Sequence, residues 1–252
     1  MKFGLIGHQI EHSLSPALFK AGYDGMYPYD LIITEDFEEA YKRFLEGYDG
    51  INVTAPFKEL ALRKVDIISE ECRLVGATNL LIKTPQGIIA YNSDFRGLVA
   101  IFRGLKGYEK TVLIVGAGGA GKAAKAAAEA LGYETTVINR TQYNPEIIPL
   151  SAFREEFSKA DIVIYNLPVR IPEIDMLTEA DLCLGKEKVI LEANYRNPSF
   201  DNVSIQRMVS MNPLIRYIDG REWLLQQAVT GYELFTGEAP DCEAMKAAIK
   251  SK

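Results

Sequence analysis

Short apolar runs alternate with amphipathic stretches along almost the whole chain. Three strand-like runs open it, at residues 2–7, 29–34 and 50–54. The stretch after the second run repeats its apolar residues at helical spacing, which predicts a helix with four side chains on one face: Phe37, Tyr41, Phe44 and Leu45. Strands and helices therefore interleave from the start, as is typical of an α/β fold.

The next segment has the pattern of a β-hairpin. Residues 78–82 (TNLLI) and 87–91 (GIIAY) are apolar runs separated by the turn-like residues TPQ. Before the hairpin, Pro56 is suited to open a short helix, because proline is tolerated in the first helical turn. After the hairpin, we expect Asp94 to cap a helix that ends near Gly104.

The pattern changes near residue 100, where we expect a domain boundary. TVLIV at 111–115 is a continuous β-rich run, as expected of a strand buried on both faces, and an alanine-rich helical stretch follows. Three more strand-like runs and two final helices come after it: 135–139, 160–165, 188–193, about 221–235 and about 241–250. This βαβ order predicts a right-handed, mostly parallel sheet covered by helices.

The composition narrows the classes of protein and partner. With 252 residues and 48% hydrophobic composition, the chain can form one large core or two modest ones. A formal net charge of −6 argues against nucleic-acid or anionic-membrane binding, and no apolar run approaches the ~20 residues of a membrane span. Cys72, Cys183 and Cys242 are far apart, so we expect no disulfide framework, no metal site and a cytoplasmic location.

A glycine-rich turn, GAGGAG, separates the run 111–115 from the alanine-rich helix. A dinucleotide-binding fingerprint needs this strand-to-helix context. The first glycine allows the tight turn, the second lets the backbone approach a pyrophosphate, and the third lets helix and strand pack closely. The helix N-terminus then offers N–H groups to phosphates. The candidate cofactor-binding residues of this turn are Gly116, Gly118, Gly119, Ala120 and Gly121.

The end of the next predicted strand refines the cofactor. An NAD site usually places Asp or Glu there to bind the ribose hydroxyls. This chain has Asn139, Arg140 and Thr141 instead. A guanidinium can bind a 2′-phosphate in a fork, whereas a carboxylate would repel it. We therefore expect NADP as the cofactor, with NAD possible.

Small polar side chains concentrate beside the predicted strand ends of the first hundred residues. Ser13 and Ser15 are two residues apart, so an extended chain would point both hydroxyls the same way. Asn52 and Thr54 have the same spacing, and Lys58 follows them. Further polar residues stand in GATN and NSD: Asn79, Asn92, Ser93 and Asp94. Together with a nucleotide-binding domain downstream, these clusters favour one polar binding site.

Seven motifs resemble those of the shikimate dehydrogenase family in order and approximate spacing: HSLSP, GINVTAPFKE, GATN, NSD, GAGGAG, NRT and a late QA after DG. The resemblance spans nearly the whole chain, and NVTxPFK is its most specific block. It implies reversible, NADPH-dependent reduction of 3-dehydroshikimate to shikimate. It also implies an α/β substrate domain, residues 1–100 with 222–252, and a Rossmann-type doubly wound NADP-binding domain, residues 101–221, with the C-terminal helices returning to the first domain.

The resemblance also implies roles for individual residues. Ser13 and Ser15 would hold the substrate carboxylate with help from Tyr195. Three residues would contact the ring hydroxyls: Thr54, Asn79 and Gln227. Lys58 and Asp94 would form the catalytic pair. Hydride arriving at a ketone carbon builds negative charge on oxygen, which a nearby ammonium stabilises and can protonate. Whether Lys58 alone or the pair donates the proton stays open, and the protein is expected to be a monomer or homodimer.

Three departures from the family pattern keep alternatives open. The second basic residue expected three or four positions after Arg140 is replaced, since Gln142, Tyr143 and Asn144 follow Thr141. NATPxGM survives only as Asn166-Leu167-Pro168, and DGLGM becomes Asp219-Gly220-Arg221-Glu222-Trp223. A quinate/shikimate dehydrogenase using NAD or NADP is therefore one alternative. A non-catalytic protein that binds a shikimate-type ligand is another, although binding alone does not require both Lys58 and Asp94.

Overall fold

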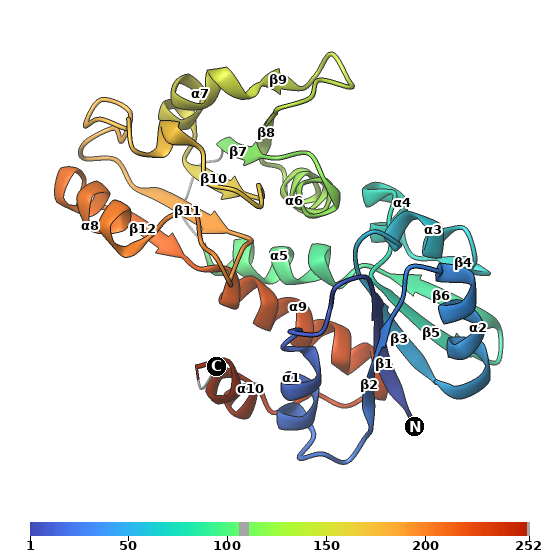
Figure 1. Cartoon of the computed structure of the whole chain (residues 1–252). Coiled ribbons are helices and arrows are strands. Elements are labelled where there is room, and N and C mark those ends of the chain that lie inside the picture. Colours follow the sequence, from blue (N-terminus) through green and yellow to red (C-terminus); the bar gives the residue numbers. More distant parts are fainter. Residues whose placement is uncertain (106–110, 251–252) are drawn as a thin grey trace. The chain divides into compact units, whose positions relative to one another are not determined.

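The computed structural model describes residues 1–105 and 111–250 (Figure 1). The chain forms two compact units, unit 1 with residues 1–97 and 225–252 and unit 2 with residues 98–224. The predicted division placed these boundaries at 100/101 and 221/222. Both observed boundaries fall inside helices, α5 (Ser93–Gly104) and α9 (Gly220–Thr236), where a continuous helical pattern carries no signal of a domain boundary.

Unit 1 contains a six-stranded sheet with the strand order β2-β1-β3-β5-β6-β4. Its strands are β1 (Phe3–Gly7), β2 (Tyr29–Ile33), β3 (Gly50–Val53), β4 (Ile67–Ile68), β5 (Leu80–Thr84) and β6 (Gly87–Tyr91). Strand β1 pairs in parallel with β2 and β3, whereas β5 runs antiparallel to both β3 and β6. The predicted hairpin is thus confirmed, and it makes this sheet mixed rather than mostly parallel.

Helices cover both faces of the sheet in unit 1 (Figure 1). Those lying wholly within unit 1 are α1 (Ser15–Gly22), α2 (Phe37–Gly47), α3 (Lys58–Leu62), α4 (Glu70–Val75) and α10 (Cys242–Lys250). On one face, α2 buries Phe37, Tyr41 and Phe44 against Ile6 and Ile51 of the sheet. On the other face, rings from α1, β1 and α9 pack closely. The ring centres of Phe3 and Phe235 are 4.8 Å apart in a stacked pair, and those of Phe19 and Tyr232 are 4.7 Å apart in an edge-to-face pair.

Two details of the predicted helices of unit 1 were wrong. Leu45 is 43% exposed, because it lies at the margin of the apolar face of α2 that buries Phe37, Tyr41 and Phe44. Helix α3 begins at Lys58 with Phe57 as its N-cap, so Pro56 belongs to the preceding turn. That turn is closed by the hydrogen bond from the Phe57 N–H to the Thr54 carbonyl.

Unit 2 contains a six-stranded parallel sheet with the order β12-β11-β10-β7-β8-β9. Its strands are β7 (Thr111–Val115), β8 (Glu134–Asn139), β9 (Ile148–Pro149), β10 (Ile162–Tyr165), β11 (Lys188–Glu192) and β12 (Ile215–Ile218). Counted within the unit, this is the strand order 6-5-4-1-2-3 of a doubly wound dinucleotide-binding sheet. The predicted Rossmann-type architecture is therefore confirmed.

The helices that lie wholly within unit 2 are α6 (Gly119–Ala130), α7 (Phe153–Lys159) and α8 (Asn202–Met211), with short 3₁₀ turns at Leu150–Ala152 and Pro172–Ile174. Helix α6 is the predicted alanine-rich helix, and its small side chains let it pack closely on the sheet: Ala123, Ala124, Ala127 and Ala128 are fully buried. The segment 140–147 between β8 and β9 is irregular.

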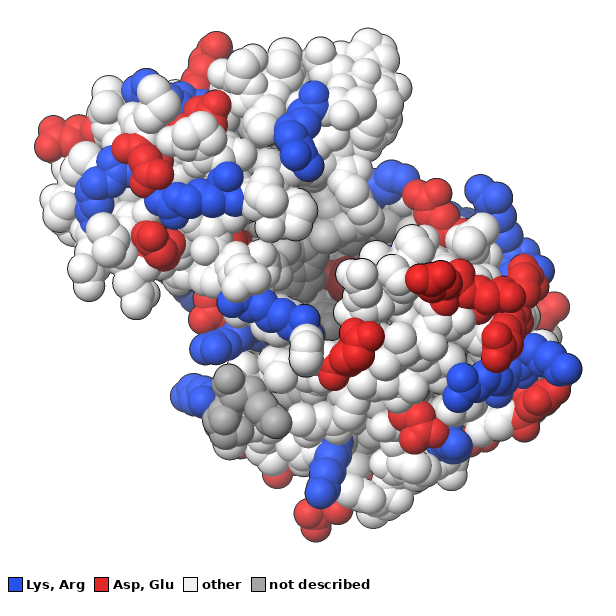
Figure 2. Space-filling model, in the orientation of Figure 1, with Lys and Arg blue, Asp and Glu red and all other residues white. Residues whose placement is uncertain are grey.

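The cysteines, the surface charges and the helix lengths bear on the classes of protein considered from the sequence. Cys72, Cys183 and Cys242 are free, and burial raises the pKa of the Cys72 thiol to about 11. On the face shown in Figure 2, basic and acidic side chains are interspersed. Within the described residues, none of the helices combines the length and apolar character that crossing a membrane would require.

Lys188, the first residue of β11, is a buried cation in unit 2. Its side chain is 2% exposed, and its ammonium donates to the carbonyls of Phe157 and Ala160 at the end of α7. It also lies 5.0 Å from the centre of the Phe157 ring. Burial lowers the pKa of Lys188 from 10.5 to about 8, because removal from water disfavours the charged form.

This lowered pKa predicts a pH-dependent stability. Between pH 8 and 10.5 the unfolded chain binds the Lys188 proton more tightly than the folded protein, so the free energy of unfolding rises with pH across this window. Lys188→Met removes the titrating ammonium and with it this rise in the free energy of unfolding with pH. We expect the wild type to gain about 2–3 kcal/mol relative to Lys188→Met between pH 7 and pH 10. Urea unfolding at both pH values measures it, with the exposed Lys186→Met as control; a pH-independent difference would contradict the argument.

Candidate functional site

The strand directions of unit 1 bring four loops to one edge of the sheet. Strands β1 and β3 are parallel, so their carboxyl ends meet there. Strand β5 is antiparallel to β3, and its first residue, Leu80, pairs with Asn52 near the end of β3. Leu80 also pairs with Tyr91, the last residue of β6. The loops that carry Ser13, Lys58, Asn79 and Asp94 therefore all leave or enter the sheet at this edge.

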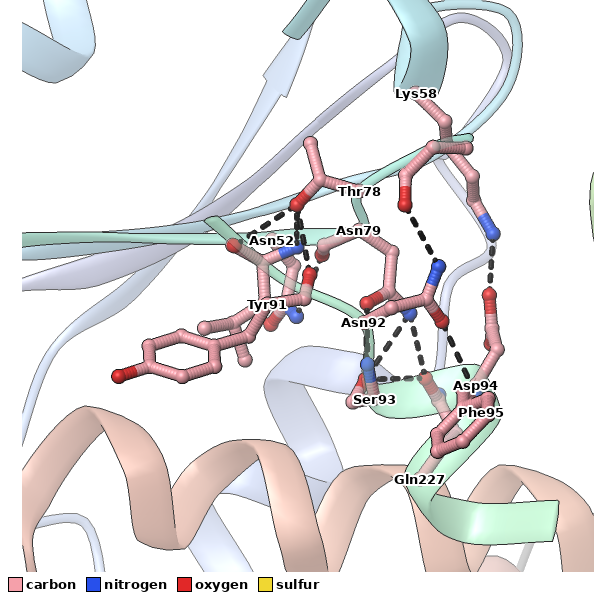
Figure 3. Close-up of polar contacts among 12 residues, drawn as sticks. Asn52, Lys58, Thr78, Asn79, Tyr91, Asn92, Ser93, Asp94, Phe95 and Gln227 are labelled. Atoms are coloured by element: carbon pink, nitrogen blue, oxygen red, sulfur yellow. Dashed lines mark hydrogen bonds and ion pairs between the residues drawn. The ribbon is translucent and has the colours of Figure 1, made fainter. Parts of the chain in front are cut away.

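A lysine–carboxylate pair lies at the centre of this edge. Lys58, the first residue of α3, donates from Nζ to Oδ2 of Asp94 at 2.6 Å (Figure 3). The two side chains are 21% and 16% exposed, so the pair is partly shielded from water yet open to a ligand. The Lys58 carbonyl also accepts from the Thr78 N–H at 3.2 Å, which ties α3 to the loop that carries Asn79.

Asp94 is not the helix cap that the sequence predicts. The Asn92 side-chain oxygen accepts from the Phe95 N–H at 3.0 Å and caps α5, while its amide nitrogen donates to the Ala77 carbonyl at 3.0 Å. Asp94 therefore stands inside the first turn of α5, and its carboxylate faces Lys58 (Figure 3). NSD contains three residue types that cap helices well, and only the fold decides which of them does so.

Asn79, Ser93 and Gln227 form one hydrogen-bonded cluster beside this pair (Figure 3). Ser93 donates from its N–H to the Asn79 side-chain oxygen at 2.7 Å. The Asn79 amide nitrogen lies 3.0 Å from Ser93 Oγ and 3.5 Å from Gln227 Oε1. Gln227 comes from α9, far along the chain. The fold therefore brings together two residues predicted to act at this site, Asn79 and Gln227, with Ser93, which the sequence indicated only as part of a polar cluster.

Ser13 and Ser15 also meet, although not as strand residues. Their hydroxyls are 3.1 Å apart, and Ser13 Oγ accepts from the Ser15 N–H at 3.2 Å. Leu14 between them has helical backbone angles, and Ser15 is the first residue of α1. The chain is therefore not extended here, and a turn at the start of a helix brings the two hydroxyls together.

Tyr29 is a polar residue of this region that sequence reasoning missed. Its hydroxyl donates to Asn52 Oδ1 at 2.8 Å, and the Asn52 amide donates to the Asn79 carbonyl at 3.2 Å. Burial raises the pKa of the Tyr29 hydroxyl well above its ordinary value, so it acts as a neutral donor. Thr54 follows β3, where its N–H donates to the Ile6 carbonyl at 2.9 Å. Since tyrosine is common in strands, nothing in the sequence marked Tyr29 as part of this chain of hydrogen bonds.

The glycine-rich turn of unit 2 has the shape that a dinucleotide requires. Gly116 has φ +102°, which strongly favours glycine. A Cβ on Gly121 would lie 1.9 Å from the Gly116 carbonyl oxygen, whereas a Cβ on Gly118 would meet nothing within 4 Å. Helix α6, with Gly118 as its N-cap, starts directly behind the turn. The third glycine is thus required by the close approach of backbone to backbone, and the second faces open space that can receive a phosphate.

The segment after β8 lies against this turn. The Tyr143 hydroxyl donates to the Ala117 carbonyl at 2.7 Å, and the Asn139 amide donates to the Thr141 carbonyl at 3.0 Å. Arg140, between Asn139 and Thr141, is exposed. A cavity of about 530 Å³ opens beside the turn, lined by α6, β8 and the segment after it, with Lys122, Lys125 and Tyr143 among its walls. Tyr143 is one of the two positions, with Asn144, at which the resemblance led us to expect a second basic residue, and it contributes a hydrogen bond there.

Tyr195 lies in the loop after β11 of unit 2, and a buried carboxylate shapes this loop. Glu192 is fully buried and accepts from the N–H groups of Ser199 and Phe200 and from the Tyr217 hydroxyl. A Cβ on Gly220 would lie 2.8 Å from the Tyr195 nitrogen, so this glycine allows the loop to approach α9. Trp223 is 4% exposed and belongs to the core.

Two family models match successive parts of the chain. Residues 5–81 match the shikimate dehydrogenase substrate binding domain. Residues 86–209 match the NAD binding domain of D-isomer specific 2-hydroxyacid dehydrogenases. The first match contains the loops of Ser13, Lys58 and Asn79, and the second contains the glycine-rich turn and Arg140.

Relatives and solved structures match over the whole length. An NADP⁺ shikimate dehydrogenase of Caldanaerobacter subterraneus subsp. tengcongensis is 30% identical, with 94% of this chain and 91% of the relative covered. The structure of shikimate 5-dehydrogenase from Thermus thermophilus with NADP(H) and shikimate has a TM-score of 0.82 and 26% identity, and covers 100% and 99% of the two chains.

A quinate dehydrogenase structure from Corynebacterium glutamicum in complex with NAD has a TM-score of 0.84 over 100% and 99% of the two chains. Its sequence identity of 22% supports a shared fold alone. The 30% identity over 94% of the chain to a curated shikimate dehydrogenase goes further. With the substrate-domain match and the polar edge of unit 1, it establishes that this chain belongs to the shikimate dehydrogenase family.

Proposed function

We propose that this protein is an NADP-dependent shikimate dehydrogenase, an oxidoreductase that reversibly reduces 3-dehydroshikimate to shikimate. The observation that carries this function is the partly buried pair of Lys58 and Asp94, 2.6 Å apart, beside the amides of Asn79 and Gln227. A ketone reductase needs a cation where negative charge develops on the carbonyl oxygen. In a chain of this family, the pair supplies that cation and a carboxylate that orients it.

Lys58 acts on the reacting oxygen. Its ammonium hydrogen-bonds to the carbonyl oxygen of the ketone and stabilises the charge that forms there as the carbon is reduced. The same ammonium is placed to deliver the proton that completes the alcohol. Asp94 holds the ammonium in this orientation through the 2.6 Å contact and balances its charge in a partly dry site. In the oxidation direction, the pair receives the proton of the alcohol.

The remaining residues of the site hold the substrate. The paired hydroxyls of Ser13 and Ser15 are suited to donate to the substrate carboxylate, with Tyr195 as a third donor. Thr54, Asn79 and Gln227 contact the ring hydroxyls. Since these groups are set by a sheet edge and by helices, they restrict the ring to one orientation relative to Lys58.

The residues of unit 2 fit a dinucleotide. When bound, NADPH supplies the hydride for the reduction. The backbone of Gly118 to Gly121 receives the pyrophosphate, because the turn offers N–H groups at the start of α6 and open space at Gly118. Arg140 pairs with the 2′-phosphate, and Asn139 and Thr141 shape the segment around it. These are the cofactor-binding residues we propose, together with Gly116.

The alternatives are less well supported. The curated relative reported above, 30% identical over 94% of this chain, is an NADP⁺ shikimate dehydrogenase, so a quinate dehydrogenase is not favoured. A purely ligand-binding protein has no need of an oriented lysine–carboxylate pair. The oligomeric state, monomer or homodimer, and the cytoplasmic location stay predictions.

A direct assay tests the proposed function. Shikimate or quinate is offered with NADP or NAD in all four combinations, and cofactor reduction is followed by absorbance. We expect shikimate with NADP to give at least a tenfold higher kcat/KM than any other combination. Quinate with NAD as the best pair would support the broader dehydrogenase, and inactivity in all four with shikimate still bound would support a binding protein.

Lys58→Ala tests the catalytic pair. The lysine acts on charge that develops in the transition state, so we expect kcat to fall about 10²–10³-fold while KM for shikimate changes less than about threefold. Lys64→Ala, which removes an exposed lysine six positions further on, serves as control and should retain activity. Equal losses in binding and turnover would contradict the assigned role.

Arg140→Ala tests cofactor selection. Loss of a charge-assisted contact to the 2′-phosphate should raise KM for NADP about 10–100-fold and leave KM for NAD nearly unchanged. Arg216→Ala, at an exposed arginine of β12, is the matched control. Steady-state kinetics with both cofactors measures the ratio, and an unaltered preference for NADP would remove Arg140 from the phosphate site.

A further inference from the structure

Ser93 occupies the junction between the two amide side chains of the site in unit 1 (Figure 3). It is 1% exposed, and its hydroxyl contacts both partners: Oγ lies 3.0 Å from Asn79 Nδ2 and 3.2 Å from Gln227 Oε1. A buried hydroxyl with two such contacts can accept from one partner while it donates to the other. The order of donors and acceptors in this series of hydrogen bonds determines which atoms of the Asn79 and Gln227 amides remain for a ligand.

The Ser93 backbone settles the orientation of Asn79. A backbone N–H can only donate, so the atom that faces it at 2.7 Å must be the Asn79 oxygen. The other Asn79 atom is then the amide nitrogen, which faces Ser93 Oγ at 3.0 Å and the Gln227 side chain at 3.5 Å. Asn79 therefore turns N–H groups toward Ser93 Oγ and Gln227, and its oxygen lies further from Oγ, at 3.3 Å.

The orientation of Gln227 follows from that of Asn79. Because an N–H of Asn79 faces it, the nearer Gln227 atom must be the oxygen. Ser93 Oγ accepts from Asn79, so its own hydrogen is directed to Gln227 Oε1 at 3.2 Å. The Asn79 oxygen, 3.3 Å from Oγ, is already served by the Ser93 N–H. The Gln227 oxygen thus accepts hydrogen bonds from Asn79 and Ser93 within the protein. The two hydrogens on Gln227 Nε2 remain to bind a ligand.

Helix packing holds Gln227 at this place. A Cβ on Gly97 would lie 2.6 Å from the Gln227 nitrogen, and a Cβ on Gly231 would lie 3.1 Å from the Ser93 Cβ. Gly97 follows Ser93 by one turn of α5, and Gly231 follows Gln227 by one turn of α9, so each glycine shares a helix face with its partner. The two helix segments approach closely through these glycines, which fixes the distance between Ser93 and Gln227.

We propose that Ser93 is a positioning residue that determines substrate specificity by fixing the Gln227 carboxamide as a hydrogen-bond donor. Beside Lys58, the site then presents N–H groups to the ligand and recognises oxygen lone pairs, those of a ring hydroxyl or ketone, over a protonated amine. This inference rests on the proposed function and names the chemistry that its substrate must offer at Gln227.

The test compares Ser93→Ala, which removes the hydroxyl, with Ser93→Thr, which keeps it. We expect Ser93→Ala to raise KM for shikimate about tenfold, with kcat within about threefold, because Gln227 is free to turn while Lys58 and Asp94 keep their contact. Ser93→Thr should return KM to within about threefold of the wild type. KM for NADP should stay unchanged in both. The control is Ser69→Ala, at the N-cap residue of α4, whose side chain makes no capping hydrogen bond.

A second readout is independent of turnover. In the wild type, the side-chain amide hydrogens of Asn79 should exchange slowly with deuterium by NMR, and in Ser93→Ala about tenfold or more faster. An unchanged KM, unchanged exchange, or loss of kcat and KM for both substrate and cofactor without rescue by threonine would overturn the proposal. If the wild type does not oxidise shikimate, the proposed function fails, and the exchange rates alone decide the role of Ser93.

Discussion

The reversal of chain direction at β5 is the constraint on which the site in unit 1 depends. In an all-parallel sheet, the residues before β5 would lie at the opposite edge from the ends of β1 and β3. Because β5 runs antiparallel to β3 and pairs in turn with β6, Asn79 before β5 and Asp94 after β6 reach the same edge as Ser13 and Lys58. The reversed direction of β5 therefore brings Asn79 to the edge of the sheet where Lys58 and Asp94 lie 2.6 Å apart.

Within that frame, buried hydrogen bonds restrict the polar side chains to single orientations. Tyr29 donates to Asn52, Asn52 donates to the Asn79 carbonyl, and Ser93 links Asn79 to Gln227. In a partly dry site an unpaired polar group is costly, so each member has one favoured donor–acceptor order. A site of this kind can bind its ligand with little loss of side-chain freedom, which favours catalysis over loose binding.

In unit 2 the backbone of the glycine-rich turn, rather than a set of polar side chains, is restricted to one conformation. Gly116 and Gly121 approach so closely that a Cβ on the second would overlap the carbonyl of the first. The segment after β8 is held to this turn by Tyr143, one of the two positions at which the resemblance led us to expect a second basic residue. Under the proposed function, selection of the 2′-phosphate would rest on Arg140, and the hydrogen bond of Tyr143 to the Ala117 carbonyl holds the segment that carries it.

Much of this architecture could be predicted from the sequence, because local patterns determine local structure. The strands of both sheets that contain long apolar runs, the hairpin, the alanine-rich helix and the glycine-rich turn all follow from residue periodicity and from glycine geometry. The motifs around Lys58 and Asp94 led to the family. The two-residue strands β4 and β9 carry too short a pattern to be recognised.

Only the tertiary structure decided which polar groups meet. Asn92, rather than Asp94, caps α5, and this choice frees the Asp94 carboxylate for Lys58. Ser13 and Ser15 are brought together by a helix start rather than by an extended strand. Gln227 reaches Asn79 from 148 positions later in the chain. Such contacts depend on strand direction and on helix packing through Gly97 and Gly231, which are long-range properties that the pattern of a local segment does not contain.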